Sequence, residues 1–291
     1  MIEYINCIIC NKNVRLDNSS EIIKVRSNIR SFQDKKYSVW RCHYCNSIHS
    51  KQDINFEDFY KNYPIFDLKN KPFTNFTLSK RVKRLKKLGL KKSDTILDYG
   101  CGSGIMIYFL KKIGYKNAIG YDKYNKKFLN EKILDNKYDF IICQDVLEHS
   151  ENPRLLLEKI TKMLKKSGIL SIGTTNADYI KLNNPEKYLM SLHQPYHRHI
   201  FSEKSLILLS KKIGLKVKKV YNRYYMNSII PLVNHRFIIE YRSRKGNILE
   251  PIFGKRFDLK TILNHDIIFY AIFGYFFYPK TEMEILFQLS D

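Results

Sequence analysis

The stretch DTILDYGCGSGIMIYFL, Asp94–Leu110, decides the fold. The apolar run TILDYG predicts a short strand, and the apolar run that begins at Ile105 predicts a helix. Gly100, Gly102 and Gly104 stand between them. Glycine permits a tight turn and lets a ligand approach the main chain without a Cβ in the way. The helix that follows presents free N–H groups and the positive end of its dipole, so the loop predicts a site for a small molecule that carries an anionic group.

Two acidic residues narrow the choice of ligand. Asp122 ends the next predicted strand, NAIGYD, at a distance from the loop where an acid can hold both hydroxyls of a ribose. The dinucleotide fingerprint is G-x-G-x-x-G, whereas here the third glycine comes one residue early. A carboxylate at Asp98, just before the first glycine, would repel a pyrophosphate but suits an ammonium group. The loop therefore favours an adenosine-containing ligand with a zwitterionic amino-acid tail.

Strand and helix patterns alternate over most of the chain after Phe73. Strands are expected at TILDYG, NAIGYD, YDFIICQDV, GILSIGTTN, KVKKVYNR and EMEILFQLS. Helices are expected at TLSKRVKRLKKLGL, IMIYFLKKIGY, YNKKFLNEKIL, RLLLEKITKMLKKSG after Pro153, and FSEKSLILLSKKIGL with Ser202 as its N-cap. This alternation predicts an α/β fold, a doubly wound, Rossmann-like and mostly parallel sheet with helices on both faces. Residues 221–278 break the rhythm and are expected to form an insertion before the last strand, where it could contact a substrate.

Cysteines mark a second, smaller region at the N-terminus. Four of the six lie in the first 45 residues as two C-x-x-C pairs: Cys7, Cys10, Cys42 and Cys45. Two such pairs are a common donor set for tetrahedral zinc, although four free thiols are the alternative. We expect a zinc-ribbon-like module at residues 1–55, followed by a connector at 56–72. A closed four-thiolate site is structural, and it leaves no coordination position for the nearby His43 and His49.

Taken together and in order, the motifs resemble those of class I S-adenosylmethionine-dependent methyltransferases. The run ILDYGCGSG is similar to the first motif of that family, and the likeness continues through Asp122, YDFIICQDVLEHSENP and KKSGILSIGTTN, over roughly residues 77–220. The resemblance implies S-adenosylmethionine as cofactor and a methyltransferase domain at 73–291. It also implies a set of cofactor-binding residues: Asp98, Gly100, Cys101, Gly102, Gly104, Asp122 and Gln144. The segment 123–137 is shorter than its counterpart in the family, so the contacts to adenine stay open, with three candidates: Asn130, Glu131 and Gln144.

Methyl transfer from a sulfonium is an in-line displacement, in which the protein aligns the acceptor and, for a hydroxyl, removes its proton. Histidine is the natural base near neutral pH. The segments after the third and fourth strands, DVLEHS and HQPYHRHIF, supply the candidates for catalytic roles: Asp145, Glu148, His149, His197 and His199. The second segment resembles the family's P-x-H-x-x-x-F sequence over the cofactor mouth, with Pro195, His197 and Phe201 matching. The alternative is that His149 packs under the cofactor and that His197 and His199 brace the loop.

The acceptor is less well specified. A ribbon followed by FEDFYKNY and a methyltransferase core resembles a bacterial-type group that tailors sugars and surface polysaccharides, which implies O-methylation of a nucleotide-linked or glycan sugar. The formal net charge of +23 and pI near 9.6 keep RNA or cap methylation as an alternative, although surface lysines alone can produce such a balance. A zinc-ribbon binding module with an inactive core is a further alternative. The intact Asp98, Asp122 and three glycines argue against it.

The most apolar run is IIFYAIFGYFFY, residues 267–278. It is shorter than the roughly 20 residues that span a bilayer. It therefore predicts either a buried element or an interfacial patch on a membrane surface. The N-terminus has no basic segment followed by a long apolar one, so we expect no signal peptide and no transmembrane segment, and a cytoplasmic protein with reduced thiols.

Overall fold

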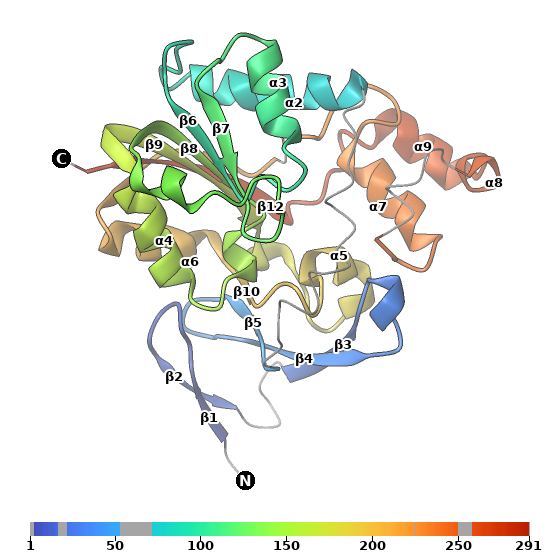
Figure 1. Cartoon of the computed structure of the whole chain (residues 1–291). Coiled ribbons are helices and arrows are strands. Elements are labelled where there is room, and N and C mark those ends of the chain that lie inside the picture. Colours follow the sequence, from blue (N-terminus) through green and yellow to red (C-terminus); the bar gives the residue numbers. More distant parts are fainter. Residues whose placement is uncertain (1–2, 17–21, 53–71, 224, 250–257, 291) are drawn as a thin grey trace. The chain divides into compact units, whose positions relative to one another are not determined.

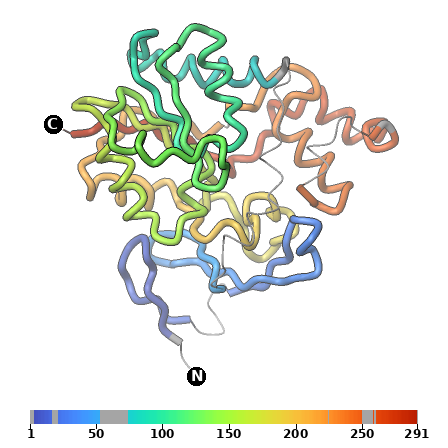
Figure 2. Tube along the Cα trace, viewed as in Figure 1, coloured from blue at the N-terminus to red at the C-terminus, as the bar shows by residue number. Residues whose placement is uncertain are grey.

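The structure is a computed structural model that describes residues 3–16, 22–52, 72–223, 225–249 and 258–290. Contacts group the chain into two compact units. The sheet unit comprises Asn55–Thr174, Leu206–Tyr221 and Met283–Asp291. The ribbon unit comprises Met1–Ile54, Thr175–Ser205 and Asn222–Glu282, which can be followed by residue number along the trace in Figure 2. No helix in the described ranges is long and apolar enough to span a bilayer.

The sheet unit confirms the predicted α/β fold. Its strands are β6 (Ile96–Tyr99), β7 (Ala118–Tyr121), β8 (Tyr138–Gln144), β9 (Leu164–Thr175), β11 (Leu215–Tyr221) and β12 (Glu282–Leu289), in the order β11-β12-β9-β8-β6-β7. Strand β6 pairs in parallel with β7 and β8, and β8 pairs in parallel with β9, while β12 pairs antiparallel with β11. All four residues of β6 are buried, as expected for a strand covered on both faces.

Helices cover both faces of this sheet (Figure 1). They are α2 (Pro72–Lys86) and α3 (Ile105–Lys112) on one face, and α4 (Pro153–Lys162) and α6 (Glu203–Lys212) on the other. Helix α4 begins where the sequence predicts, because the Asn152 side chain accepts the Leu155 N–H and Pro153 occupies the first turn. Ser202 caps α6 as predicted, with its hydroxyl accepting the Ser205 N–H at 3.0 Å.

The helix predicted at YNKKFLNEKIL is wrong. Between β7 and β8 the chain forms a loop and one 3-10 turn, Glu131–Asp135. Asp122 accepts hydrogen bonds from the N–H groups of Tyr124 and Asn125, and the Asn125 side chain accepts that of Lys127. Such side-chain bonds offer the backbone an alternative to helical pairing, so helix formation here is outcompeted.

The described residues of the ribbon unit form two small sheets. Strands β1 (Glu3–Asn6) and β2 (Asn13–Leu16) form one, and the other has the order β10-β5-β4-β3, made from β3 (Ile22–Arg26), β4 (Lys36–Arg41), β5 (Ile48–Ser50) and β10 (His199–Ile200). Short helical elements complete this part of the unit: η1 (Arg30–Phe32), η5 (Ala177–Tyr179), η6 (Pro185–Tyr188) and α5 (Leu189–Leu192). One apolar core joins residues distant in sequence: Val25, Val39, Ile48, Ala177, Ile180, Leu182, Leu189, Leu192 and Ile200.

The contact grouping differs from the predicted boundaries. Strand β5 pairs with β10, so strands β3–β5 share a sheet and a core with residues of the segment 175–205. The predicted insertion at 221–278 forms α7 (His235–Ser243), α8 (Leu259–Ile262) and α9 (His265–Phe273), and it belongs to the same unit. The connector predicted at 56–72 lies outside the described residues, apart from Pro72. The division into a module, a connector and a domain stays a prediction.

A buried ion network anchors α2 to the sheet. The sequence suggests a solvated basic face for SKRVKRLKKLGLKK, but Arg81 is only 2% exposed. The Glu284 carboxylate on β12 lies 3.3 Å from Arg81 Nε, also accepts a hydrogen bond from Arg84, and accepts the Ser171 hydroxyl at 2.8 Å. Burial alone would raise the pKa of Glu284, but the two guanidiniums outweigh it and hold that pKa below its ordinary value. The sequence of α2 does not predict this ion network, because lysine-rich helices usually face water.

Replacement of Glu284 by Ala should lower the free energy of unfolding at pH 7 by about 3–5 kcal/mol, because the buried guanidinium of Arg81 and the partly buried one of Arg84 lose their carboxylate. The matched control is Glu158→Ala, which removes the partly exposed Arg154 pair and should cost less than about 1 kcal/mol. Since the folded pKa of Glu284 is depressed, its contribution is present above the unfolded value of about 4.3 and is lost as the pH falls through the folded value. Urea unfolding followed by circular dichroism checks this. Equal losses in the two variants at pH 7 would contradict it.

Candidate functional site

The glycine loop joins β6 to α3 at the carboxyl edge of the parallel strands. Gly100, Gly102 and Gly104 all have positive φ, at 76°, 53° and 76°. A Cβ on Gly100 would lie 2.2 Å from Val146, and one on Gly104 would lie 2.2 Å from Phe128. Both positions therefore require glycine for conformation and for space, which explains the bare backbone of the sequence motif.

Asp122 holds this loop from the end of β7. One carboxylate oxygen accepts the Gly102 N–H at 2.8 Å, and the other accepts the N–H groups of Tyr124 and Asn125. The Asn125 side chain donates to the Gly102 carbonyl at 2.7 Å. The predicted ribose acceptor and the predicted glycine loop thus meet in the structure. Asn125 was not foreseen, because its contact depends on the turn after β7.

Asp98 lies on β6 directly beneath the loop. It is 5% exposed, and burial raises its pKa to about 6, with Arg81 opposing and Asp122 reinforcing the shift. A cation bound next to this buried carboxyl would stabilise its charged form. The Cys101 thiol packs where a Cβ of Gly120 would lie, at 2.7 Å from that position. Burial raises the pKa of the Cys101 and Cys143 thiols, so both behave as small protonated packing groups.

The segment after β8 brings several predicted residues together. Gln144 accepts a hydrogen bond from Arg81 at 2.7 Å and donates one to Asp145 at 2.7 Å. Asp145 has φ of 53° and is exposed to solvent. Glu148, fully buried, and His149, half-buried, follow on the 3-10 turn η4 (Leu147–His149). Arg81 is the residue in this group that sequence reasoning missed, since α2 lies far away in sequence.

The other adenine candidates are engaged in local contacts. Asn130 caps the 3-10 turn by accepting the Lys132 N–H. Glu131 accepts a hydrogen bond from the Tyr121 hydroxyl at 2.7 Å. Their role in binding adenine stays a prediction.

Three histidines of HQPYHRHIF are held by hydrogen bonds inside the ribbon unit. His197 is 7% exposed, and its Nδ1–H donates to the Ser191 carbonyl at 2.8 Å. Burial lowers its pKa to about 4, so the ring is neutral at pH 7 with its lone pair on Nε2. His193 pairs through Nδ1 with the Asn28 side chain at 2.8 Å, and its ring stacks on Tyr196. This fixes the orientation of the loop that carries the predicted base.

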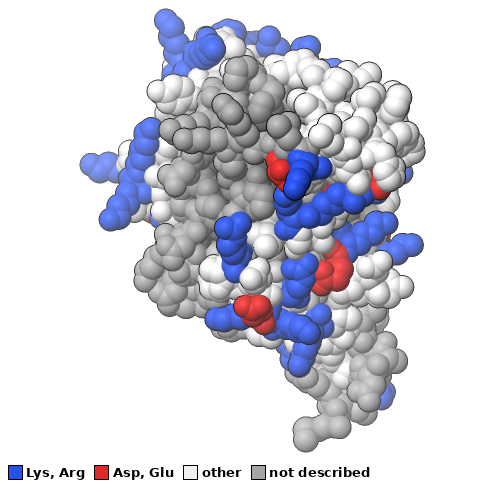
Figure 3. Space-filling model, turned by 90° about the vertical axis from the view of Figure 1, so that its right-hand side faces the viewer, with Lys and Arg blue, Asp and Glu red and all other residues white. Residues whose placement is uncertain are grey.

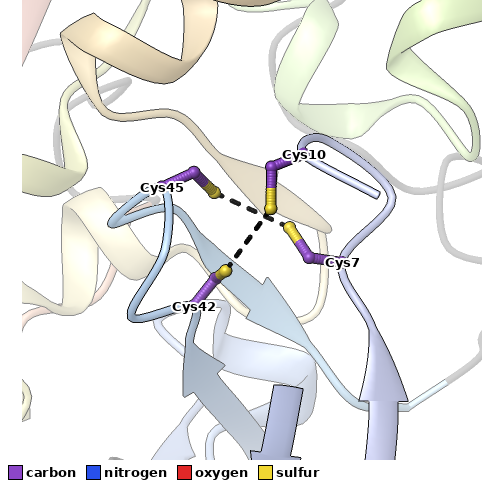
Figure 4. A group of neighbouring side chains, drawn as sticks. All are labelled: Cys7, Cys10, Cys42 and Cys45. Atoms are coloured by element: carbon purple, nitrogen blue, oxygen red, sulfur yellow. Dashed lines mark hydrogen bonds between the residues drawn. The ribbon is translucent and has the colours of Figure 1, made fainter. Parts of the chain in front are cut away.

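The four N-terminal cysteines converge on one point (Figure 4). Their sulfurs all lie within 4.8 Å of one another, and the Cys7–Cys45 and Cys10–Cys42 separations are both 3.7 Å. A Zn–S bond of about 2.3 Å implies sulfurs about 3.8 Å apart in a tetrahedron. The donor set and spacing therefore fit a tetrahedral metal ion.

The two C-x-x-C turns have the same local structure. The Asn11 N–H donates to the Cys7 carbonyl and the Asn46 N–H to the Cys42 carbonyl, each at 2.7 Å. Both asparagines have positive φ, near 60°. Each turn thus folds back through an asparagine that tolerates the left-handed conformation. The spacing of the cysteines suggests the turns, and the asparagines were not singled out.

Hydrogen bonds join the second cysteine turn to the start of α6. His49 Nε2 lies 3.3 Å from Cys7 Sγ, and His49 Nδ1 lies 3.0 Å from His199 Nδ1. The Ser202 hydroxyl donates to the Cys45 carbonyl at 2.6 Å. His49 thus contacts the cysteine cluster, and His199, predicted as a catalytic candidate, lies beside it.

A model of the methyltransferase-domain family matches residues 74–220, just over half of the 291 residues. The chain belongs to this family. The matched residues contain the glycine loop, Asp122 and the segment after β8, and they form a class I S-adenosylmethionine-dependent methyltransferase domain.

Curated relatives are ubiquinone biosynthesis O-methyltransferases. One from Rickettsia bellii is 31% identical over 100 residues, which cover 28% of this chain and 42% of the relative. One from Pelagibacter ubique is 25% identical over 213 residues, 60% of this chain and 88% of the relative. The chain thus spans less than half the length of the Rickettsia relative that it matches.

Solved methyltransferase structures are also similar to the chain. The plantazolicin methyltransferase BpumL, in complex with S-adenosylhomocysteine, has 18% identity and a TM-score of 0.44, covering 81% of this chain and 94% of that one. The N-methyltransferase NodS from Bradyrhizobium japonicum WM9 has 12% identity and a TM-score of 0.44, covering 81% and 97%.

Proposed function

We propose that this chain is an S-adenosylmethionine-dependent methyltransferase that acts on a hydroxyl of a small molecule. The observation that carries the proposal is the glycine loop held by Asp122 and underlain by Asp98, inside the segment matched by the family model. Asp122 would accept hydrogen bonds from the ribose, the loop N–H groups would meet the carboxylate of the amino-acid tail, and Asp98 would lie toward its ammonium group. The bound sulfonium supplies an electrophilic methyl group.

The chain's own residues must then align the acceptor and take its proton. The acceptor oxygen forms a bond to the methyl carbon as the carbon–sulfur bond breaks, and the hydroxyl proton passes to a base. We propose His197 for that role, because its Nδ1–H is committed to Ser191 and the lone pair lies on Nε2. His149 is the second candidate, with Asp145 and Glu148 nearby in sequence. His199, hydrogen-bonded to His49, is the weakest of the three.

A sugar hydroxyl is the acceptor that the sequence resemblance implies, and a hydroxyl of a ubiquinone precursor is the one suggested by the relatives named for ubiquinone biosynthesis. Both are small-molecule O-methylations, so they share the same chemical step. The discriminating experiment presents labelled methyl donor with nucleotide sugars, phenolic acceptors and RNA in parallel. Methylation of RNA alone would overturn the small-molecule proposal.

We also propose that Cys7, Cys10, Cys42 and Cys45 hold one structural zinc ion. Four thiolates leave the metal no open position, so it would stabilise the fold and take no part in methyl transfer. The 3.7 Å sulfur separations support this proposal.

The cofactor assignment predicts that Asp122→Ala weakens S-adenosylmethionine binding at least tenfold, about 1.4 kcal/mol, because the ribose loses its acceptor. Asp122→Asn retains one acceptor oxygen and should lose less. The control is Asp135→Ala, an exposed acid of the same unit, which should bind as the wild type does. Isothermal calorimetry measures all three, and unchanged affinity in Asp122→Ala would rule out the assignment.

The base assignment predicts that His197→Asn lowers kcat by about 10²–10⁴-fold while the affinity for S-adenosylmethionine changes little. His149→Asn tests the second candidate, and His265→Asn, at an 88% exposed side chain, is the control. If both test variants stay within about threefold of the wild-type rate, neither histidine is the base.

The metal assignment predicts one zinc ion per chain by elemental analysis of protein prepared without chelator. Cys42→Ser should lose most of the metal and destabilise the ribbon unit, because metal binding contributes directly to folding in thiolate modules. Cys143→Ser, at a buried thiol outside the cluster, should retain it. Wild-type protein free of zinc would contradict the assignment.

A further inference from the structure

Helix α9 is apolar on the side that it buries and on the side that it exposes. Its buried side packs Ile267 and Ala271 against Phe237 and Tyr241 of α7. The opposite side exposes four large apolar residues between 41% and 47%: Ile268, Phe269, Ile272 and Phe273. A surface helix normally carries polar residues on its exposed side. The apolar exposed side of α9 therefore indicates a binding surface.

The exposed side continues beyond the helix into one surface. The Phe269 ring lies 5.3 Å from that of Phe273 and 5.5 Å from that of Phe277. We name as the aromatic patch the following exposed residues: Leu263, Ile268, Phe269, Ile272, Phe273, Phe276 and Phe277. Contiguous apolar surface of this kind marks an interaction site with protein or membrane.

The acidic groups next to the aromatic patch in sequence are paired with cations. Both carboxylates of the described residues 258–280 are paired, Asp258 with Lys245 and Asp266 with Arg244, each at 2.6 Å. Lys260 and Lys280 are exposed on either side of the patch in sequence. Lys and Arg also outnumber Asp and Glu on the face drawn in Figure 3, as they do in the whole chain, 51 to 28.

We propose that the aromatic patch docks on an anionic membrane surface. The apolar side chains would enter the boundary between headgroups and acyl chains, and Lys260 and Lys280 would lie among the lipid phosphates. Helix α9 has nine residues, which suits an element that lies on a membrane rather than one that crosses it. A second copy of the chain is the less favoured occupant, because two surfaces of a molecule with a net charge of +23 repel each other. The proposal does not depend on methyl transfer.

The test is sedimentation of the full chain with vesicles of phosphatidylcholine alone and with about 30% phosphatidylglycerol. Wild-type protein should bind the anionic vesicles and bind the neutral ones much less. The double variant F269S/F277S keeps every charge and should bind at least about tenfold more weakly. The matched control is L155S/L208S, which replaces two exposed leucines on α4 and α6 and should bind as the wild type does. K260E/K280E should reduce binding to anionic vesicles only.

Three results would overturn the proposal. Equal binding of F269S/F277S and wild type would mean that net charge alone attracts the vesicles. Absence of wild-type binding would exclude the membrane. A dimer in light scattering that F269S/F277S dissociates, with no effect of the patch on vesicle binding, would assign this surface to self-association. Thermal unfolding of each variant verifies that the fold is retained, which is expected because every replaced side chain is more than 40% exposed or lies outside the cores.

Discussion

The carboxylate of Asp122 is the contact on which the candidate cofactor site depends. It fixes Gly102 through one oxygen and the turn after β7 through the other, so the loop adopts its shape before a ligand arrives. Ordering a loop costs conformational entropy, and a loop that is already ordered spares the ligand that cost. The surrounding packing reinforces this, since Val146 and Phe128 occupy the space where side chains on Gly100 and Gly104 would lie.

A second set of polar contacts, centred on Arg81, lies at the same edge of the sheet. Arg81 on α2 joins Glu284 on β12 to Gln144 at the end of β8. The central strands, the first helix and the segment with the catalytic candidates are therefore fixed by one buried guanidinium. Such a group is costly to bury unless its partners are all present, so the three elements must assemble together.

The sequence predicted the sheet unit well because its signals are local. The strand–glycine–helix pattern, Pro153 at the start of α4, and Ser202 before α6 each depend on residues close in sequence. The predicted helix after β7 failed because Asp122 and Asn125 bond to nearby N–H groups instead. Arg81 and the partnership of His49 with His199 could not be predicted, since each depends on pairing between segments more than 60 residues apart. The roles of the histidines in chemistry stay predictions.

The ribbon unit is assembled from three stretches of chain, and this affects the order in which the protein can form during synthesis. His49 contacts His199, which lies 150 residues later in the sequence, and the Asn176 N–H donates a hydrogen bond to the Thr281 carbonyl. Strand β12, which follows β9 by more than 100 residues, lies between β11 and β9 inside the large sheet. During synthesis, neither unit can therefore close until the residues around Thr281 and strand β12 have been made, and until then the cysteine turns lie next to an incomplete core. Slow folding with a long exposure of strand edges follows from such distant pairing.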